Sequence, residues 1–120
     1  MGQPVVWFEV IGKDGDALRS FYGDLFGWQF EKMPGPMDYG MVTGGNVGIG
    51  GGVGAAPNGG SEHVTFYVST DDPRGALDRA EGLGGKTLQP PTDVPGGGVH
   101  ALLSDPEGHT IGLFKPPTAS

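Results

Sequence analysis

The sequence predicts an α+β fold made of two paired βαβββ modules, and three observations support this prediction. A strand-like segment at residues 5–10 (VVWFEV) returns in altered form at residues 63–68 (HVTFYV). The two copies are 58 residues apart, as the pair Phe8 and Phe66 shows. In each copy an acidic turn leads into an amphipathic helix that stops at a glycine, and further strand-like segments follow. An internal repeat of this kind indicates one supersecondary unit in two copies.

The first strand, residues 4–11, defines the two faces of the predicted sheet. Successive side chains of a strand lie on opposite faces, so the residue order separates two sets. One face carries Val6, Phe8 and Val10, and the other carries Val5, Trp7, Glu9 and Ile11. We expect mixed sheets that curve around a central cup, with the helices outside and the second set of side chains facing the cup.

The first helix is expected over residues 14–26. Asp14 or Asp16 is placed to accept hydrogen bonds from the free amides of its first turn. Gly27 is expected to end the helix, because glycine readily adopts the left-handed conformation of a C′ residue. Apolar residues recur at helical spacing and form one stripe that we expect to face the sheet: Ala17, Leu18, Phe21, Tyr22, Leu25 and Phe26.

Three strands complete the first module, at residues 28–31, 39–43 and 47–53. The last of them is rich in glycine, which usually marks a close backbone approach or a bulge. We expect it to be a short edge strand, and native proteins usually cover the unpaired backbone groups of such edges. A homodimer would cover it, and we therefore expect one.

The second module follows a linker at residues 55–61. After the strand at residues 63–68, Asp72 and Pro73 supply the cap and the first-turn proline of a helix over residues 72–83. Gly84 and Gly85 are expected to end this helix, and its buried stripe is Ala76, Leu77, Ala80 and Leu83.

A short strand and a hairpin complete the second module. We expect the strand at residues 87–89, a loop at residues 90–98 and a hairpin of residues 99–104 and 110–114. The hairpin turn DPEG has aspartate first, proline second and glycine last, which is typical of a type I turn. The tail, residues 115–120, is expected to fray.

The length and composition restrict the class of protein. We expect one domain over residues 1–120, with modules at about residues 4–54 and 61–115. A formal net charge of −7 and a pI near 4.6 disfavour nucleic acid and anionic membranes as partners. The chain has no cysteine, no apolar run of about 20 residues and no signal-peptide pattern at its start. We therefore expect a cytoplasmic protein.

Several segments together resemble a known family. The segments FEV, FYGDLFGW, FYV and DPEGHTIGLF are similar to those of the vicinal oxygen chelate superfamily. This superfamily includes glyoxalase I, extradiol dioxygenases, fosfomycin-resistance proteins and bleomycin-binding proteins. The resemblance extends from about Val5 to Phe114. It implies paired βαβββ modules, often assembled as a homodimer, but no single function, because the superfamily has several chemistries.

The resemblance also indicates where metal ligands would stand. Members that bind metal carry a ligand on the first strand of each module and a carboxylate on the last strand. Those positions correspond here to Trp7 and Thr65 on the first strands, and to Gly50 and Gly112 on the last. None is a usual side-chain ligand, and a divalent metal needs three or more nitrogen, oxygen or sulfur donors. We therefore expect no metal or other cofactor.

An alternative metal site remains open. His63 lies two residues before Thr65, and Glu9 belongs to the strand face that we assign to the cup. Together they could supply two ligands to a divalent metal. His100 can project towards either face of its strand.

The candidate ligand-binding residues are those expected to line the cup. Trp7 is either a stacking platform for a planar ligand or a plug that packs in the core. Glu9 is the candidate for a polar ligand contact or for a catalytic base, because a carboxylate on an apolar face must be paired. The full predicted set is Trp7, Glu9, Tyr39, Met41, His63, Thr65, Tyr67, His100 and Phe114.

Two classes of function follow. The first is a metal-free protein that binds a small hydrophobic or aromatic metabolite or antibiotic. The second is a small lyase, isomerase or dioxygenase that uses a divalent metal through His63 and Glu9, or Glu9 as acid and base. The missing ligands favour the first class.

Overall fold

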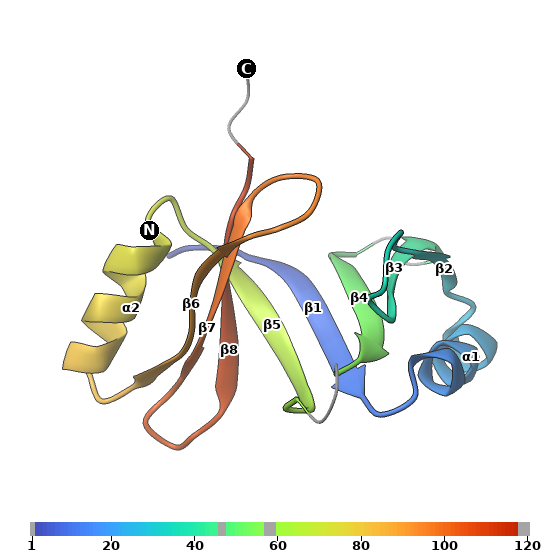
Figure 1. Ribbon diagram of the computed structural model, residues 1–120, viewed down its shortest axis with the longest axis horizontal. Helices are drawn as coiled ribbons and strands as arrows, with labels where there is room; N and C mark the ends of the chain where they lie inside the picture. The colour runs from blue at the N-terminus through green and yellow to red at the C-terminus, as the bar shows by residue number, and fades with distance from the viewer. Residues whose placement is uncertain (1, 46–47, 57–59, 118–120) are drawn as a thin grey trace. The chain divides into compact units, whose positions relative to one another are not determined.

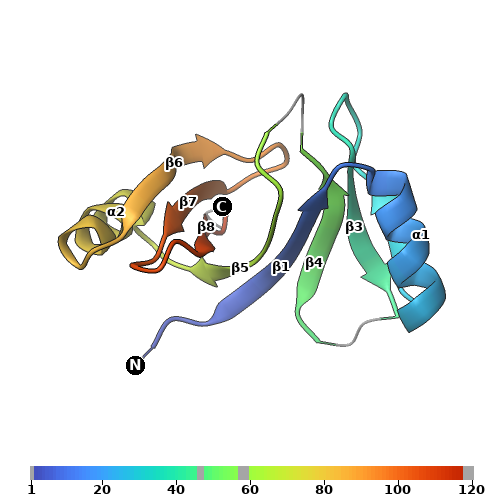
Figure 2. The ribbon, with the colours of Figure 1, turned by 90° about the horizontal axis from the view of Figure 1, so that it is seen from below.

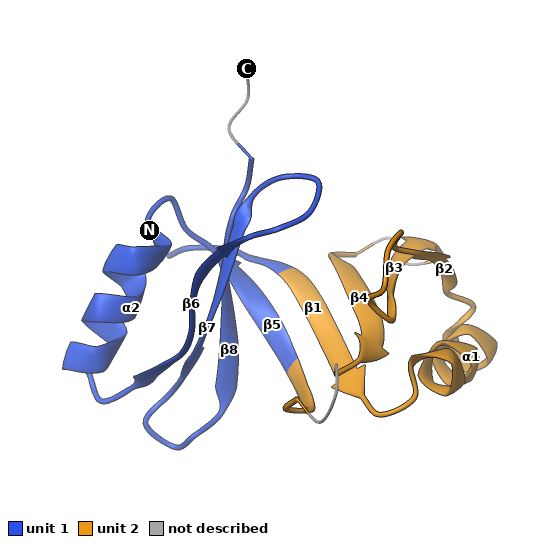
Figure 3. Cartoon of the chain, in the orientation of Figure 1, with its two compact units in different colours: residues 1–6, 65–120 blue, residues 7–64 orange. Residues whose placement is uncertain are grey.

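The computed structural model describes residues 2–45, 48–56 and 60–117. They form two compact units, which Figure 3 shows in different colours. Unit 1 comprises residues 1–6 and 65–120, and unit 2 comprises residues 7–64. Each unit has one helix on one face of a mixed sheet, so the predicted α+β class and its two βαβββ modules are confirmed (Figures 1 and 2). Neither helix within these described residues combines the length and the apolar character needed to cross a bilayer.

Unit 2 contains the first module. The strand order is β2-β3-β4-β1, in which β1 pairs parallel with β4 and the other pairs are antiparallel. The glycine-rich strand therefore lies inside the sheet and the prediction of an edge strand is wrong, so the reason we gave for a homodimer fails. The elements are β1 (Val5–Gly12), α1 (Gly15–Phe26), β2 (Gln29–Lys32), β3 (Tyr39–Gly44) and β4 (Gly50–Ala55).

The ends of α1 follow from its sequence. Asp14 is the N-cap, and its carboxylate accepts the amide of Ala17 at 3.0 Å. Gly27 has a φ of 76°, and its amide donates to the carbonyl of Gly23, so the predicted glycine C-cap is confirmed.

The apolar stripe of α1 is only partly covered. Phe8 of β1 contacts Trp28, with ring centroids 5.3 Å apart, and Trp28 also contacts Tyr22 and Phe26. This places Phe8 on the helix side of the sheet, as the alternation of β1 predicts. The prediction that the whole stripe is buried is wrong, because Phe21, Leu25 and Phe26 are each more than half exposed.

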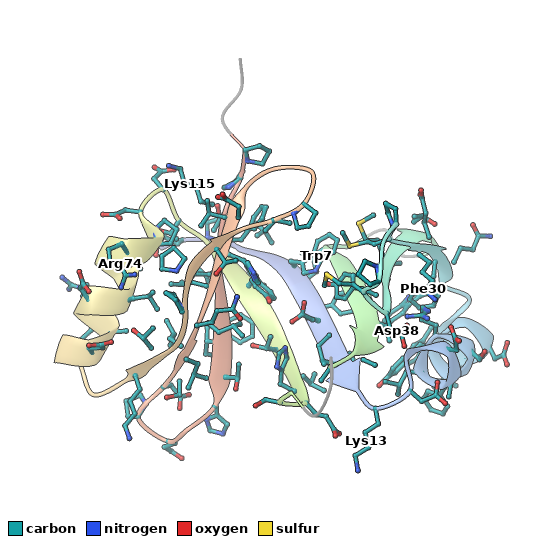
Figure 4. The ribbon with its side chains drawn as sticks, in the orientation of Figure 1. Trp7, Lys13, Phe30, Asp38, Arg74 and Lys115 are labelled. Atoms are coloured by element: carbon teal, nitrogen blue, oxygen red, sulfur yellow. The ribbon has the colours of Figure 1, made fainter. Side chains whose placement is uncertain are left out.

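Polar contacts anchor α1 to the sheet. The Arg19 side chain is 10 % exposed and donates to the carbonyl of Val53 at 2.9 Å and to the carboxylate of Asp38 at 2.7 Å. Asp38 is labelled in Figure 4. Its carboxylate also accepts the amide of Gly15 at the start of the helix. The guanidinium of Arg19 thus connects α1 to β4 and to the residue before β3.

Unit 1 contains the second module, with strand order β5-β8-β7-β6. Strand β5 pairs parallel with β8, and the other pairs are antiparallel. Asp72 caps the helix and Pro73 is its first residue, as predicted. The elements are β5 (His63–Ser69), α2 (Pro73–Gly82), β6 (Lys86–Asp93), β7 (Val99–Ser104) and β8 (Thr110–Lys115).

The core of unit 1 lies between α2 and the sheet. Leu77 is fully buried against Ala101 and Leu113. Leu83 lies beyond the last turn of α2 and is 69 % exposed, so its assignment to the buried stripe was wrong. The amide of Gly108 donates to the carbonyl of Asp105 at 2.9 Å, which is the hydrogen bond of the predicted hairpin turn.

The prediction for β6 was also incomplete. The strand continues through Pro90 and Pro91 to Asp93, where we expected a loop. Its pairing with β7 shifts register between Thr87 and Gln89 and again between Gln89 and Thr92. Proline is tolerated there because β6 is the last strand of the order, where a missing amide donor leaves no partner strand unpaired.

Three predictions fall partly outside the described residues. They are the start of the glycine-rich strand at Val47, residues 57–59 of the linker, and residues 118–120 of the tail. In the described part of the chain, β4 begins at Gly50.

Candidate functional site

The face of the unit 2 sheet opposite α1, which we call the open face of unit 2, carries the predicted site residues of the first module. Paired residues of neighbouring strands point to the same face. Glu9 pairs with Gly52, and Gly52 pairs with Met41, so Glu9 and Met41 share a face. Trp7 and Tyr39 lie two residues from Glu9 and Met41 on the same strands and therefore share it too.

Glycines of β4 make room for the aromatic rings on this face. A Cβ atom added to Gly50 would lie 2.8 Å from Cζ3 of Trp7. One added to Gly52 would overlap the ring and hydroxyl of Tyr39. Both rings therefore lie against the β4 backbone. The glycine content of this strand reflects close approach, as the sequence indicated.

Two hydrogen bonds and one electrostatic contact connect four side chains on the open face of unit 2. Nε1 of Trp7 donates to the hydroxyl of Tyr39 at 2.9 Å. The Tyr39 hydroxyl lies near Glu9, whose charge raises the pKa of the phenol. Oε2 of Glu9 lies 2.7 Å from Nε2 of His63, and the side chains of Glu9 and His63 are each 12 % exposed. We call this arrangement the Trp7–His63 chain.

Electrostatics keep the phenol of Tyr39 protonated. Burial raises the pKa of the Tyr39 hydroxyl far above its ordinary value, and the nearby charge of Glu9 raises it further. The hydrogen bond from Trp7 opposes this shift of the pKa but does not reverse it. Tyr39 therefore has its proton available for a hydrogen bond to Glu9.

Sequence reasoning named all four residues and considered Glu9 together with His63, but it did not predict the hydrogen bonds. Whether His63 faces the cup was open; the structure turns it towards Glu9, within the face that Glu9 occupies. The pairing of Trp7 with Tyr39 had no sequence signal of its own. The alternation of glycines at positions 50, 52 and 54 would have indicated room for large side chains on that face.

The equivalent face of unit 1 carries the remaining predicted residues. Tyr67 pairs with Gly112, and a Cβ at Gly112 would overlap the Tyr67 ring. His100 pairs with Phe114 and alternates with buried Ala101, so both point away from α2. Nε2 of Gln89 lies 3.2 Å from Nε2 of His100, a partner that the sequence did not indicate. We call this surface the open face of unit 1.

Thr65 is buried, and its hydroxyl donates to the backbone carbonyl of Thr110. That hydroxyl is therefore committed to a backbone group. The exposed His109, by contrast, hydrogen-bonds Asp105 in the hairpin turn.

The described residues do not fit a divalent metal of the family type. Glu9 and His63 are two donors, and no group of three or more histidine, aspartate or glutamate side chains lies together in the described ranges. The strand register also corrects one equivalence. Gly112 pairs with Tyr67 as Gly52 pairs with Glu9, so Gly52 and not Gly50 is the counterpart of Gly112.

A shallow hollow of about 290 Å³ lies elsewhere in unit 2. Its lining offers two charged side chains and no aromatic one. We place the candidate site at the Trp7–His63 chain, because polar groups and aromatic surface occur together there. The hollow is lined by Gly12, Lys13, Ala56, Gly60 and Glu62.

Comparison with known proteins supplies a family context. The model of the Glyoxalase/Bleomycin resistance protein/Dioxygenase superfamily matches residues 5–113. CFP32 of Mycobacterium tuberculosis, which carries the provisional name of a glyoxylase, is 27 % identical over 114 residues. The anthracycline biosynthesis protein DnrV of Streptomyces peucetius is 28 % identical over 125 residues. These matches cover 93 % and 91 % of this chain, but only 44 % and 46 % of the two relatives.

Solved structures share the fold. Methylmalonyl-CoA epimerase from Mycobacterium tuberculosis superimposes with a TM-score of 0.66 at 13 % identity, covering 95 % of this chain and 88 % of the other. At that identity the likeness extends to the fold alone.

Proposed function

Because the chain belongs to the Glyoxalase/Bleomycin resistance protein/Dioxygenase superfamily, we propose that it is a metal-free protein that binds a small aromatic or hydrophobic molecule. The ligand would lie on the open face of unit 2, with its ring against Trp7. The single observation that supports this proposal is the Trp7–His63 chain, in which a half-buried indole adjoins a nearly buried pair of polar groups.

Burial and polarity at the chain favour such a ligand. Binding sites for small molecules are mostly apolar and contain a few polar groups that fix orientation. Here Trp7 and Met41 supply apolar surface, while Glu9 and His63 supply the polar groups. One relative is named for anthracycline biosynthesis, a chemistry of planar aromatic molecules.

The test compares the two tryptophans of the chain, Trp7 and Trp28. Trp7 lies on the open face of unit 2, whereas Trp28 packs with Phe8 and Phe26 on the helix side. We expect Trp7→Ala to weaken binding of 2-naphthol by about 1–3 kcal/mol with the fold largely kept. Trp28→Ala should lower the unfolding midpoint and leave the affinity of the remaining folded protein unchanged. Fluorescence titration and thermal melting measure the two effects.

The opposite pattern would refute the platform. If Trp7 is a core plug, Trp7→Ala should destabilise the protein by roughly 3–5 kcal/mol. Unchanged naphthol affinity in that variant would show that the ring does not meet the ligand. A metal that remains in one-to-one stoichiometry after dialysis would contradict the metal-free proposal.

A second candidate function is metal-free acid–base catalysis, favoured by the 2.7 Å contact between Glu9 and His63. Glu9→Gln keeps the shape of the side chain and removes its charge. An enzyme would lose turnover with binding largely kept, whereas a binding protein would lose affinity only. Single-turnover assays on small oxygenated substrates separate the two outcomes.

A further inference from the structure

We propose that Nδ1 of His63 is the ligand-facing hydrogen-bond acceptor of the site, and that the ligand class is hydroxyaromatic: a planar ring that bears an acidic O–H group. The proposal rests on the proposed binding at the open face of unit 2. It adds the direction of each hydrogen bond in the Trp7–His63 chain and the polar group that the ligand must carry.

Trp7 determines which group donates and which accepts in the first hydrogen bond. An indole N–H can only donate, so the oxygen of Tyr39 must accept the 2.9 Å hydrogen bond from Trp7. The Tyr39 hydroxyl keeps its own proton, because burial and Glu9 raise the pKa of this group. That proton is therefore available to the carboxylate of Glu9.

The same logic fixes the tautomer of His63. An ionised carboxylate has no proton to give and can only accept. The contact between Oε2 of Glu9 and Nε2 of His63 therefore requires a proton on Nε2. An imidazole is ordinarily a stronger base than a carboxylate, which also places the shared proton on nitrogen. Neutral His63 then carries its lone pair on Nδ1.

The structure leaves this nitrogen accessible. In the described part of the chain, the imidazole of His63 hydrogen-bonds to Glu9 through Nε2. Every buried side-chain nitrogen or oxygen of the described residues has a hydrogen-bond partner. Nδ1 of His63 has none among them, so this atom is not buried. The side chain retains 12 % of its surface, and Nδ1 belongs to that fraction. Glu9 is thus a positioning residue, and His63 presents the acceptor.

An outward lone pair selects ligands with a hydrogen-bond donor. A phenolic O–H donates to a neutral imidazole nitrogen, whereas an ether oxygen can only accept and would leave Nδ1 unpaired. Trp7 lies two residues before Glu9 on the same face, so a ring against the indole can bring its hydroxyl towards His63.

The experiment compares two probes that differ by one methyl group, 2-naphthol and 2-methoxynaphthalene, on the wild-type chain. We expect 2-naphthol to bind about tenfold more tightly, the scale of one hydrogen bond in a partly buried site. His63→Phe should abolish this preference, so that the two probes bind this variant with equal affinity. Trp7→Ala should weaken both probes alike.

Each outcome separates the two proposals. Equal affinity of the wild type for both probes would overturn the proposal that His63 is the acceptor. It would leave the proposal that the ligand ring lies against Trp7 unaffected. Binding of neither probe would overturn both.

The tautomer provides a readout that does not depend on a ligand. Nitrogen-15 spectra of the imidazoles in mildly alkaline buffer distinguish a protonated from an unprotonated ring nitrogen. We expect a proton on Nε2 of His63 and none on Nδ1, and expect Tyr39→Phe to weaken this bias while leaving the spectrum of His109 unchanged. A neutral His63 protonated on Nδ1 would overturn the proposal.

Discussion

Units 1 and 2 have the same order of elements, yet their helices are attached by different means. Helix α2 packs through Leu77, which is fully buried against Ala101 and Leu113. Helix α1 is anchored through Arg19, while Leu25 and Phe26 on its apolar stripe are more than half exposed. The comparison shows that an amphipathic pattern predicts a helix and its polarity but not how much of the apolar face is covered.

The open faces differ in a parallel way. Each has an aromatic ring over a glycine of the paired strand, namely Tyr39 over Gly52 and Tyr67 over Gly112. Unit 2 adds an ionisable pair next to its ring, whereas unit 1 adds an amide and an imidazole. The glycine-and-ring arrangement is therefore shared by the two modules, and the polar chemistry distinguishes them.

The largest expected effect tests the helix comparison. Leu77→Ala should reduce the free energy of unfolding by about 2–5 kcal/mol, because a fully buried leucine leaves a cavity. Leu25→Ala on α1 is the matched control and should cost less than about 1 kcal/mol, since 59 % of Leu25 is already exposed. Urea denaturation measures both variants. Similar losses would show that both helices depend equally on apolar burial.

The next effect tests the shared arrangement of glycine and ring. Gly52→Ala and Gly112→Ala should each destabilise the protein by roughly 1–3 kcal/mol, because the added methyl forces Tyr39 or Tyr67 to move. Gly82→Ala meets no atom within 4 Å and should be neutral or slightly stabilising. Thermal melting of the three variants compares them. Tolerance of alanine at position 52 but not at 112 would limit the arrangement to unit 1.

A smaller effect concerns the exposed stripe of α1. We expect a homodimer that covers Phe21, Leu25 and Phe26, so Leu25→Ala should weaken association by about fivefold, or roughly 1 kcal/mol of apolar burial. Leu83→Ala, at an exposed leucine of unit 1, is the control and should leave association unchanged. Sedimentation velocity at micromolar concentration measures it. A 12.3 kDa species alone would refute the dimer.

The smallest effect concerns the Arg19 anchor and its pH dependence. The hydrogen bond from Arg19 lowers the pKa of the Asp38 carboxyl, and the charge of Arg19 lowers it further. A carboxyl with a lowered folded-state pKa stabilises the protein above its unfolded pKa of about 3.9, and this contribution disappears as the pH falls through the folded value. Asp38 is 37 % exposed, so the contribution should stay below about 1 kcal/mol.

The check is the urea midpoint between neutral and acidic pH for wild type and Asp38→Asn. The difference between the two proteins should shrink as the carboxyl is protonated. Asp16→Asn, at the more exposed partner of Arg19, should change the midpoint less. An unchanged difference at low pH would show that Arg19 holds α1 without help from the charge of Asp38.

Local sequence signals predicted most of the fold. Asp14, Gly27, Asp72 and Pro73 marked the helix ends because capping depends on single residues. The pairing of strands was harder to predict than the helix ends. The position of β4 inside the sheet depends on pairing with β1 and β3, which no local pattern encodes, and β6 continued through two prolines because it lies at an edge.

The residues of the candidate site were predicted, and Glu9 was considered together with His63, but the hydrogen bonds were not predicted. The alternation of β1 placed Trp7 and Glu9 on one face, which the structure confirms for the strand. The hydrogen bonds to Tyr39 and His63 join residues 32 and 54 positions apart in the chain, a separation that only the folded sheet closes. Gln89 was missed as the partner of His100 because the strand around it was taken as short.

The two prolines of β6 also bear on the solubility of the protein at high concentration. A free sheet edge recruits other chains when its amides and carbonyls are available in register, and this templating begins many fibrous aggregates. Pro90 and Pro91 have no amide protons to offer, and the register shifts beside them interrupt the regular spacing of the strand. That edge of unit 1 is therefore a poor seed for cross-β growth, although the chain itself is rich in short strands.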